Sequence, residues 1–499
     1  MSRINTNVNS LLGQRVLGEQ NRNLNTSLER LSTGVRINRG ADDPAGLIAS
    51  ENLRSQLTSI EAAIGNAERA EQVVNVAEGG LQEVNNLLLE VQSLVGQSAN
   101  EAGLSNEERE ANQLQIDSIL QTIDRISETT TFQGTNLLNG NFDFNIEGQG
   151  NEVTDITVNA ARIADGDERQ LDVVVTQSAQ AAGLFLSTGG TTIGSTDAGE
   201  TLTFDVAGAN GSREFSFASG TSFTDIASTI NTFTDLTGVT ASASGNGVFL
   251  LSDELGEDNF VSVDITNDAG VAGSINQLSA TNANAADTTT AVNFSAATNP
   301  IRDEGQDIEA TINGVRATTN GATASIASDF LDVSINLTNG GAQALGTFNA
   351  GTITGGGANF NLGPNVDIGN RVSLGIQSVA SRNLGSEANG FLSGLASGRD
   401  QNVIDGDLTE AQAIVNDAIS QVSEQRGRLG AFTRNTVGST IRSLGVALEN
   451  TSAAESAIRD TDFAEETAEL TRSQILVQAA TNSLSIANSN PQNALALLG

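Results

Sequence analysis

Apolar residues at both ends of the chain return at alternating steps of three and four. The residues that carry this pattern are Leu24, Leu28, Leu31 and Val35, then Leu53, Leu57, Ile60 and Ile64, then Leu81, Val84, Leu88, Val91 and Val95, and finally Val437, Ile441, Leu444 and Leu448. Such spacing places the side chains on one narrow stripe of a helix, as in the seam of a coiled coil. A stripe this long needs a second helix to cover it. The opposite terminus of the chain is the natural supplier.

Helix-breaking Gly and Pro residues divide the N-terminal part into three predicted helices. The first covers residues 1–33 and ends at a stretch with three Gly residues and an Asp43-Pro44 step, where Pro44 suits the first turn of the next helix. The second covers about 45–99, weakened at Gly79-Gly80, and the third about 106–127.

Strand-like alternation replaces the helical pattern after Phe132. Phe142–Ile146 and Ile156–Val158 alternate with polar residues, which predicts a β-hairpin lying on the helical rod. Residues 170–378 are rich in Gly, Ser and Thr with short alternating runs, which predicts one or two small β-rich domains.

Helix returns clearly at Leu408, after a good capping residue at Asp407, and runs to about 451. A last helix from about Asp460 is expected to be interrupted at Pro491. The predicted fold class is therefore α+β. We expect a long antiparallel α-helical coiled-coil hairpin formed by both termini, with a β-hairpin and one or two inserted β-rich outer domains.

Composition makes catalysis improbable. The chain has no Cys, His, Trp or Tyr, and all 24 basic residues are Arg. Thiolate or imidazole zinc sites, thiol nucleophiles and Schiff-base lysines are therefore excluded. The acidic clusters at 165–168 and 253–258 lack the ligand spacing of an EF-hand, so a solvated surface is expected there. We predict no enzyme activity, no cofactor and no metal site.

The net charge of −36 argues against nucleic acid as a partner, because phosphates would be repelled. The charge is uneven: residues 1–60 carry seven Arg and five acids, whereas residues 166–380 carry five Arg and twenty-three acids. A near-neutral end joined to an acidic middle suits a buried assembly segment with a solvated exterior.

The sequence contains no run of eighteen apolar residues, and its N-terminus lacks the apolar core of a secretory signal. We therefore expect no membrane contact. Composition alone predicts a soluble, cytoplasmic protein.

Motifs at both ends, however, resemble those of bacterial flagellin. The matching stretches are 1–7, 28–34, 37–47, 97–100 and 132–140 at the front, and 423–432, 449–450, 458–463 and 491–495 at the back. They cover about 160 residues at the front and about 120 at the back. The middle matches only loosely.

The resemblance implies a structural subunit that self-assembles into the hollow helical filament of the flagellum for swimming motility. It implies inner-core segments at 1–44 and 456–499, outer-tube segments at 45–169 and 379–455, and a variable surface insertion at 170–378. The implied location is extracellular, which reverses the cytoplasmic prediction, since subunits of this family leave unfolded through a type III apparatus without a cleaved signal. The implied partners are further copies, cap and hook-associated proteins, the export apparatus, and an export chaperone at the C-terminal helix.

The predicted self-assembly residues lie in the terminal helices and in the first linker. They are Leu24, Leu28, Leu31, Leu470, Leu476, Val477, Leu484, Leu495 and Leu498, together with Arg30, Arg36, Arg39, Asp42, Asp43 and Pro44 in and beside the linker. The leucine and valine stripes would form core in any coiled protein. The charged residues are expected to pair within or between subunits, where surface pairs contribute little.

Residues 88–100 match the face by which many flagellins contact an animal innate immune receptor. Leu94 and Gln97 fit that pattern, but Glu90 stands where those flagellins have Arg, and Gln115 where they have Glu. A cation exchanged for an anion lowers affinity, so we expect weak or absent receptor activation.

Two alternatives remain, and a third is excluded. A hook–filament junction (hook-associated) protein shares the same terminal helices, and a non-flagellar coiled adhesin would share the stripes. A flagellin with an inserted zinc peptidase needs His residues, and this chain has none.

Overall fold

The structure, a computed structural model, describes residues 6–100, 103–164, 166–190, 192–194, 200–279, 282–328 and 330–496. Its contacts divide the chain into two units. One contains residues up to 72, 361–370 and from 431 onward, and the other contains 73–360 and 371–430. Long helices together with antiparallel sheets make the fold α+β.

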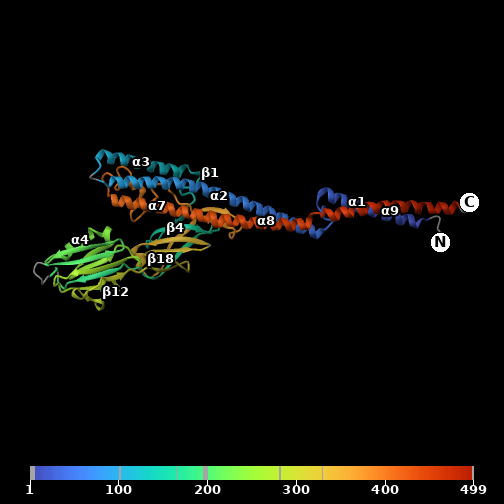
Figure 1. Cartoon of the computed structure of the whole chain (residues 1–499). Helices are drawn as coiled ribbons and strands as arrows, with labels where there is room; N and C mark the ends of the chain where they lie inside the picture. The colour runs from blue at the N-terminus through green and yellow to red at the C-terminus, as the bar shows by residue number, and fades with distance from the viewer. Residues whose placement is uncertain are drawn as a thin grey trace. The chain divides into compact units, whose positions relative to one another are not determined.

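The first unit is helical. It contains α1 (Val8–Thr33), the first half of α2 (Pro44–Ser98), the π-helical stretch η4 (Phe432–Val437), α8 (Gly438–Arg459) and α9 (Phe463–Ala496). Helices α1 and α9 lie side by side (Figure 1) and run antiparallel. Asn7 bonds to Ala487 near one end of the pair, and Val35 bridges to Asp460 at the other.

The ends of α1 follow from two residues. The side chain of Asn7 accepts the N–H of Ser10 and caps the first turn. Gly34 closes the helix with φ 76°, a left-handed conformation that suits glycine, and its N–H donates to the carbonyl of Arg30.

The predicted interruption at Pro491 is wrong, because α9 continues to Ala496. A proline in a helix leaves the carbonyl four residues earlier without its usual donor. Here that carbonyl belongs to Ala487, and it accepts the side-chain amide of Asn7 at 2.8 Å. A partner on another helix therefore satisfies the group that Pro491 leaves free.

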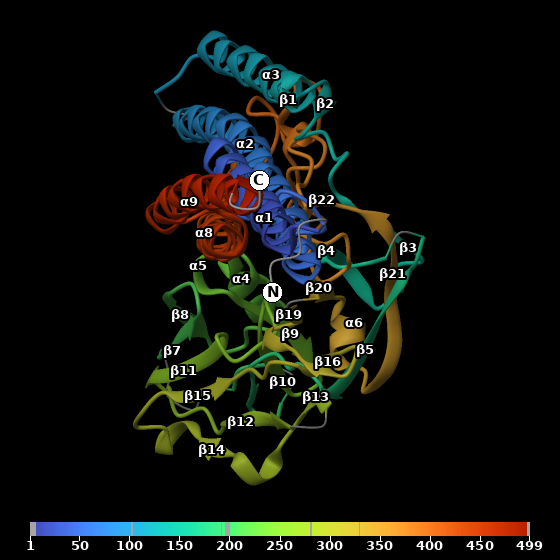
Figure 2. The same cartoon turned by 90° about the vertical axis from the view of Figure 1, so that its right-hand side faces the viewer.

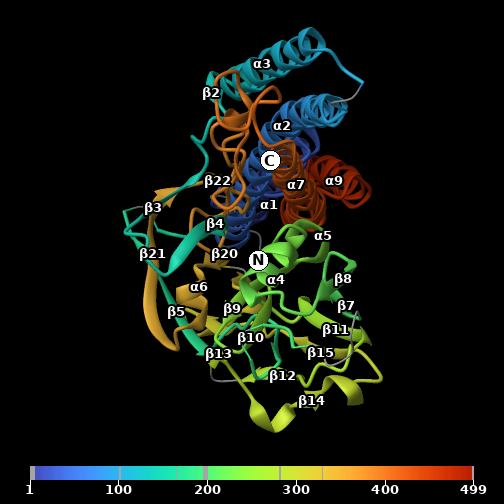
Figure 3. The same ribbon diagram turned by 90° about the vertical axis from the view of Figure 1, so that its left-hand side faces the viewer.

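The second unit contains three long helical segments: residues 73–98 of α2, α3 (Asn106–Thr129) and most of α7 (Leu408–Ala431). The second half of α2 lies beside α3 (Figure 3). Its buried residues keep the three-four spacing: Val74, Ala77, Leu81, Val84, Leu88, Val91 and Val95. Helix α3 begins with a complete capping box between Ser105 and Glu108.

An outer β part builds one hydrophobic core between two sheets (Figure 2). The first sheet contains β13 (Asn282–Ala286), β12 (Ser274–Ser279), β6 (Gly183–Ser187), β10 (Gly247–Ser252), β9 (Val239–Ser244) and β14 (Val292–Asn293). The second contains β15 (Ile301–Glu304), β11 (Phe260–Asn267), β7 (Thr201–Gly208) and β8 (Ser212–Ala218). Helix α4 (Phe223–Asn231) packs Phe223, Ile226 and Ile230 into this core, and the short α5 (Thr234–Thr237) follows it.

An inner β part builds a second core. One sheet contains β17 (Val315–Arg316), β16 (Glu309–Ile312), β5 (Arg169–Gln177), β21 (Gly346–Gly356) and β3 (Phe144–Glu147). The other contains β18 (Thr318–Asn320), β19 (Thr323–Ala327), β20 (Leu331–Leu337) and β4 (Val153–Ala161), and α6 (Asn339–Gln343) follows β20. Shorter strands are β22 (Ala358–Asn361), β23 (Arg371–Leu374), β24 (Gly385–Ser386) and β25 (Gly390–Phe391).

The predicted β-hairpin between 142–146 and 156–158 is wrong. Strand β3 pairs with β21, and β4 pairs with β20, so the two runs belong to different sheets. Alternation predicts a half-buried strand but contains no information about its partner. That partner lies more than 200 residues away for β3, since Thr352 pairs with Glu147, and 170–184 residues away for β4, since Leu331 pairs with Ala161 and Leu337 with Val153. A small hairpin does form nearby, between β1 (Thr131–Phe132) and β2 (Thr135–Asn136), with Gln133 and Gly134 both at positive φ.

Substitution of Ala for two adjacent glycines of α2, Gly79 and Gly80, should change stability in opposite directions. A Cβ on Gly80 would lie 2.7 Å from Cδ1 of Leu138 and 2.9 Å from Oγ1 of Thr130, and Leu138 is fully buried. We expect Gly80→Ala to lower the free energy of unfolding by about 1–3 kcal/mol through overpacking. Gly79 has no atom within 4 Å of the equivalent position. Gly79→Ala should raise stability by up to about 1 kcal/mol through helix propensity. Urea unfolding of both variants checks this, and equal effects would contradict it.

Candidate functional site

The contact row between α1 and α9 mixes small and polar side chains with leucines and one valine. Ser10 and Ser27 of α1 are buried there, as are Glu466 and Ser473 of α9. Half-buried residues complete the row at alternating steps of three and four: Gly13, Leu17, Leu24 and Leu31 on α1, and Leu470, Val477, Ala480, Leu484 and Ala487 on α9. The helices thus approach closely where small residues meet, and leucines and Val477 fill the positions between them.

Large apolar side chains lie on the outer faces of the same two helices. They are between 42% and 63% exposed: Val8, Leu11, Leu12 and Leu28 on α1, and Phe463, Ile475, Leu476 and Ile486 on α9. Single exposed apolar residues are ordinary, but eight on one pair of helices leave a large apolar area uncovered.

The predicted assembly residues therefore fall into two groups. Leu24, Leu31, Leu470, Val477 and Leu484 lie in the contact row between α1 and α9. Leu28 and Leu476 face outward. The side chain of Leu495 and all of Leu498 lie outside the described residues. Sequence reasoning missed six of the outward residues: Val8, Leu11, Leu12, Phe463, Ile475 and Ile486. Val8, Leu11 and Leu12 recur at steps of three and four and could have been found, whereas Phe463 and Ile486 have no apolar residue at those steps.

The linker between α1 and α2 is tied to the α8–α9 junction. Arg36 donates from its N–H to the carbonyl of Arg459 and from Nη2 to the carbonyl of Ile458, both at 2.6 Å. The N–H of Thr461 donates to the carbonyl of Gly34 at 3.0 Å. Arg459 also forms an ion pair with Glu51 at 3.0 Å.

The other predicted linker residues pair within the chain. Arg30 lies 3.6 Å from Glu466, and Arg39 lies 2.9 Å from Glu29. Asp43 accepts the N–H of Gly46 and so caps α2, which begins at Pro44 as predicted.

Asp42 organises the linker locally. Its Oδ2 accepts the backbone N–H groups of Arg39 at 2.8 Å and Asn38 at 3.0 Å. The backbone hydrogen bond from Arg39 is the main cause that lowers the pKa of Asp42 below its ordinary value, and the bond from Asn38 adds to it. Since the pKa is lower in the folded state, this stabilisation is present above the unfolded pKa. It is lost as pH falls through the folded pKa.

The receptor-like residues differ in their exposure. Leu94 is only 6% exposed, because it packs inside the helical core of the second unit. Glu90 and Gln115 are exposed, and Gln97 donates to the hydroxyl of Ser93. The exposed leucines nearby are Leu89 and Leu114.

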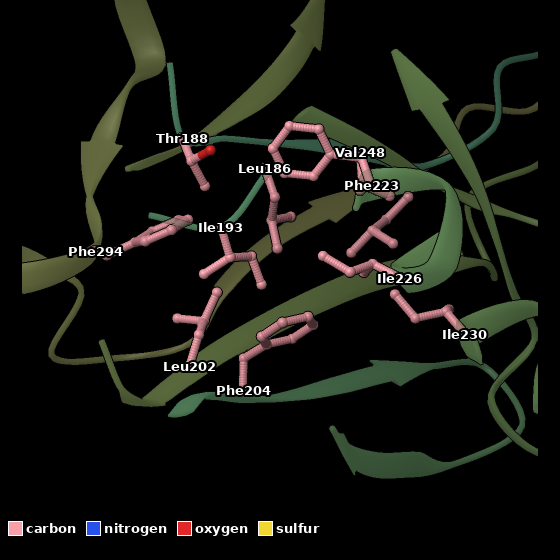
Figure 4. Close-up of a pocket in the computed structure, with 11 residues that line it drawn as sticks. Leu186, Thr188, Ile193, Leu202, Phe204, Phe223, Ile226, Ile230, Val248 and Phe294 are labelled. Carbon is pink, nitrogen blue, oxygen red and sulfur yellow. The ribbon is translucent and has the colours of Figure 1, made fainter. Parts of the chain in front are cut away.

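The hollow inside the core of the outer β part is small and apolar. Leu186, Phe204, Phe223 and Phe294 help to line a gap of about 20 Å³ (Figure 4), which is roughly the room of one water molecule. Within the described ranges no group of three or more acidic side chains is arranged to hold a metal ion. Asp165, from one predicted acidic cluster, lies outside those ranges. Among the described helices, none is long and apolar enough to span a membrane.

Comparisons with known proteins identify a family by the helical regions at the two ends of the chain. Residues 4–143 match the family model of the bacterial flagellin N-terminal helical region, residues 412–498 the C-terminal helical region, and residues 201–253 the flagellin hook IN motif. The chain is 31% identical to a B-type flagellin of Pseudomonas aeruginosa, over 99% of each chain. The chain belongs to the bacterial flagellin family.

Further relatives bear the same family name. A flagellin B of Vibrio anguillarum is 28% identical over 99% of each chain. A solved FliC structure from Burkholderia pseudomallei covers 73% of this chain and 99% of its own at 15% identity, but its TM-score of 0.23 is too low to support an argument. This flagellin is a structural subunit of the extracellular flagellar filament and not an enzyme. The hook–filament junction alternative is not favoured.

The carboxylate of Asp42 supplies a test of the linker. In Asp42→Asn, hydrogen exchange of the amides of Asn38 and Arg39 should be faster near neutral pH. The difference from the parent chain should shrink as pH falls through the lowered pKa of Asp42, because the parent carboxylate then becomes protonated as well. Exchange rates are referenced to the unfolded chain at each pH. Asp43→Asn is the matched control, since Asn caps a helix as well as Asp does. A difference that persists at low pH would contradict the assigned role.

Proposed function

We propose that the outward apolar rows of α1 and α9 are the surface by which each copy contacts its neighbours in the filament. The observation that carries this proposal is the exposure of eight large apolar side chains that the contact between α1 and α9 leaves uncovered. On this view α1 and α9 form a coiled-coil hairpin that is completed by other copies.

Energetics support burial of these rows. Covering the exposed half of a Leu or Ile side chain stabilises an assembly by about 1 kcal/mol, and a polymer repeats that gain along its length. Electrostatic repulsion between copies opposes this burial little along most of α9, because residues 473–499 contain no charged side chain. Repulsion between the acidic middles of neighbouring copies is screened beyond about 8–10 Å in physiological salt.

We propose the following division of labour along the chain. Residues 1–44 and 456–499 line the inner tube, residues 45–169 and 379–455 form the outer tube, and residues 170–378 project into solvent. The near-neutral composition of the first 60 residues and the twenty-three acids of residues 166–380 support this assignment.

The partners beyond further copies follow from family membership. We propose that cap and hook-associated proteins contact the same terminal helices, that an export chaperone covers α9 before assembly, and that the chain leaves through the type III apparatus. Weak or absent activation of the innate immune receptor is also proposed. It is supported by the exposed Glu90 and by the burial of Leu94.

The outward row can be tested with neighbouring residues of α9. Leu476→Ala should leave the unfolding free energy of the monomer within about 0.5 kcal/mol, because the side chain is exposed. The critical concentration for polymerisation, measured by sedimentation, should rise about tenfold or more, since at least one apolar contact per copy is lost. Gln478→Ala, at another exposed position of the same helix, is the control. Equal critical concentrations for both variants would overturn the assignment of this row.

Removal of residues 456–499 tests the role of α9 as a whole. The truncated chain should keep the β parts folded, because neither of their cores contains any residue beyond 353. It should form no filaments under conditions in which the full chain polymerises. Electron microscopy detects filaments, and circular dichroism checks the β parts. Filaments formed by the truncated chain would refute the proposal.

A further inference from the structure

The amide of Asn7 joins the first turn of α1 to the last part of α9. Its Oδ1 accepts the N–H of Ser10 at 3.1 Å, and its Nδ2 donates to the carbonyl of Ala487 at 2.8 Å. In an α-helix that carbonyl would accept from residue 491, but Pro491 has no N–H. Asn7 therefore caps one helix and satisfies the vacated carbonyl of the other. Asp could do only the first, because its carboxylate has no donor.

A buried carboxylate marks the opposite end of the helix pair. Glu466 is 8% exposed, its Oε2 lies 3.6 Å from Nη1 of Arg30, and its Oε1 has no hydrogen-bond partner in the described part of the chain. Arg30 is held in place by a second bond, from Nε to the carbonyl of Arg36 at 3.1 Å. Separating a buried carboxylate from its cation is strongly unfavourable, so this contact penalises any other alignment.

The residues between these ends select the alignment only weakly. Apolar positions of α1 recur every seven residues at Leu17, Leu24 and Leu31, and small positions of α9 recur at Ser473, Ala480 and Ala487. A slip of one heptad, about 10 Å, would bring similar side chains together again. Polar groups at defined positions are the usual means by which paired helices choose one register.

We propose that Asn7, with Pro491 behind it, and the Arg30–Glu466 pair form a two-ended lock that selects the register of α1 against α9. The ends lie about twenty residues apart on each helix, roughly 30 Å. Sliding the helices by one heptad places Glu466 opposite Asn23, which has no charge.

The same slip also breaks the hydrogen bond from Asn7 to the carbonyl of Ala487. It moves Asn7 to the carbonyl of Ala480, which the helix already occupies with the N–H of residue 484. Both contacts are therefore lost in a single step. The role of this lock in the filament rests on the proposed function, in which α1 and α9 form the contacts between copies.

A disulfide can report the register, because the chain has no cysteine. A Cβ on Gly13 would lie 3.6 Å from Cβ of Leu484, within the range of 3.5–4.5 Å that a disulfide needs. Gly13→Cys with Leu484→Cys therefore reports the observed register. Gly13→Cys with Val477→Cys reports a slip of one heptad. Both are oxidised as full-length chains, before and after polymerisation, and the cross-linked fraction is measured on non-reducing gels.

In the parent background we expect the Gly13/Leu484 pair to cross-link and the Gly13/Val477 pair to remain largely reduced. Adding Asn7→Asp and Glu466→Gln together should raise the ratio of slipped to observed cross-link about tenfold or more. Each change alone should raise the ratio less. The carboxylate of Asn7→Asp still caps α1 and suits its N-terminus, so a change of ratio would not reflect a weaker helix.

Two further variants separate the lock from general effects. Pro491→Ala supplies an N–H that competes for the carbonyl of Ala487 and should shift the ratio in the same direction as Asn7→Asp. Glu469→Gln removes a carboxylate from an exposed pair with Arg472 on the same helix and should leave the ratio unchanged.

An unchanged ratio in the double variant, or an equal shift in Glu469→Gln, would overturn the lock. Failure of the parent chain to polymerise would count against the proposed function alone, because the cross-links of the unpolymerised chain still report the register.

Discussion

The antiparallel contact between α1 and α9 is the interaction on which the rest of the molecule's role depends. Its row contains Ser10, Gly13, Ser27 and Ser473 between leucines, so the helices can approach closely at the small residues. Other large apolar residues remain on the outer faces. A pair built in this way is incomplete as a hydrophobic structure, which is a useful property in a subunit that must add to a polymer.

The same pairing accounts for features that a single helix would not tolerate. Pro491 lies inside α9, and the carbonyl it deprives of a donor is satisfied from α1. Glu466 is buried beside Arg30, and the linker after α1 is bonded through Arg36 to the end of α8. Each of these polar groups would be costly if the partner helix were absent. They therefore restrict how the two ends of the chain can meet.

The two β parts are stabilised independently of α1 and α9. Each has its own hydrophobic core between antiparallel sheets, and neither core contains residues of α1 or α9. Their surface holds most of the acidic excess of the chain, whereas residues from 473 onward have no charge. The division suits a filament in which neutral ends are buried and acidic middles repel one another through screened solvent.

The sequence by itself determined the long helices, their approximate bounds, the β-rich character of the middle and the family. Periodicity and caps are local properties, so Pro44, Gly34 and Asp407 could be interpreted without knowledge of the fold. Only the tertiary structure decided which segments meet. Strands β3 and β4 have distant partners, Leu24 faces inward while Leu28 faces outward, and Leu94 is buried. The continuation of α9 past Pro491 also required the structure, because the donor that replaces the missing N–H comes from Asn7, about 480 residues away.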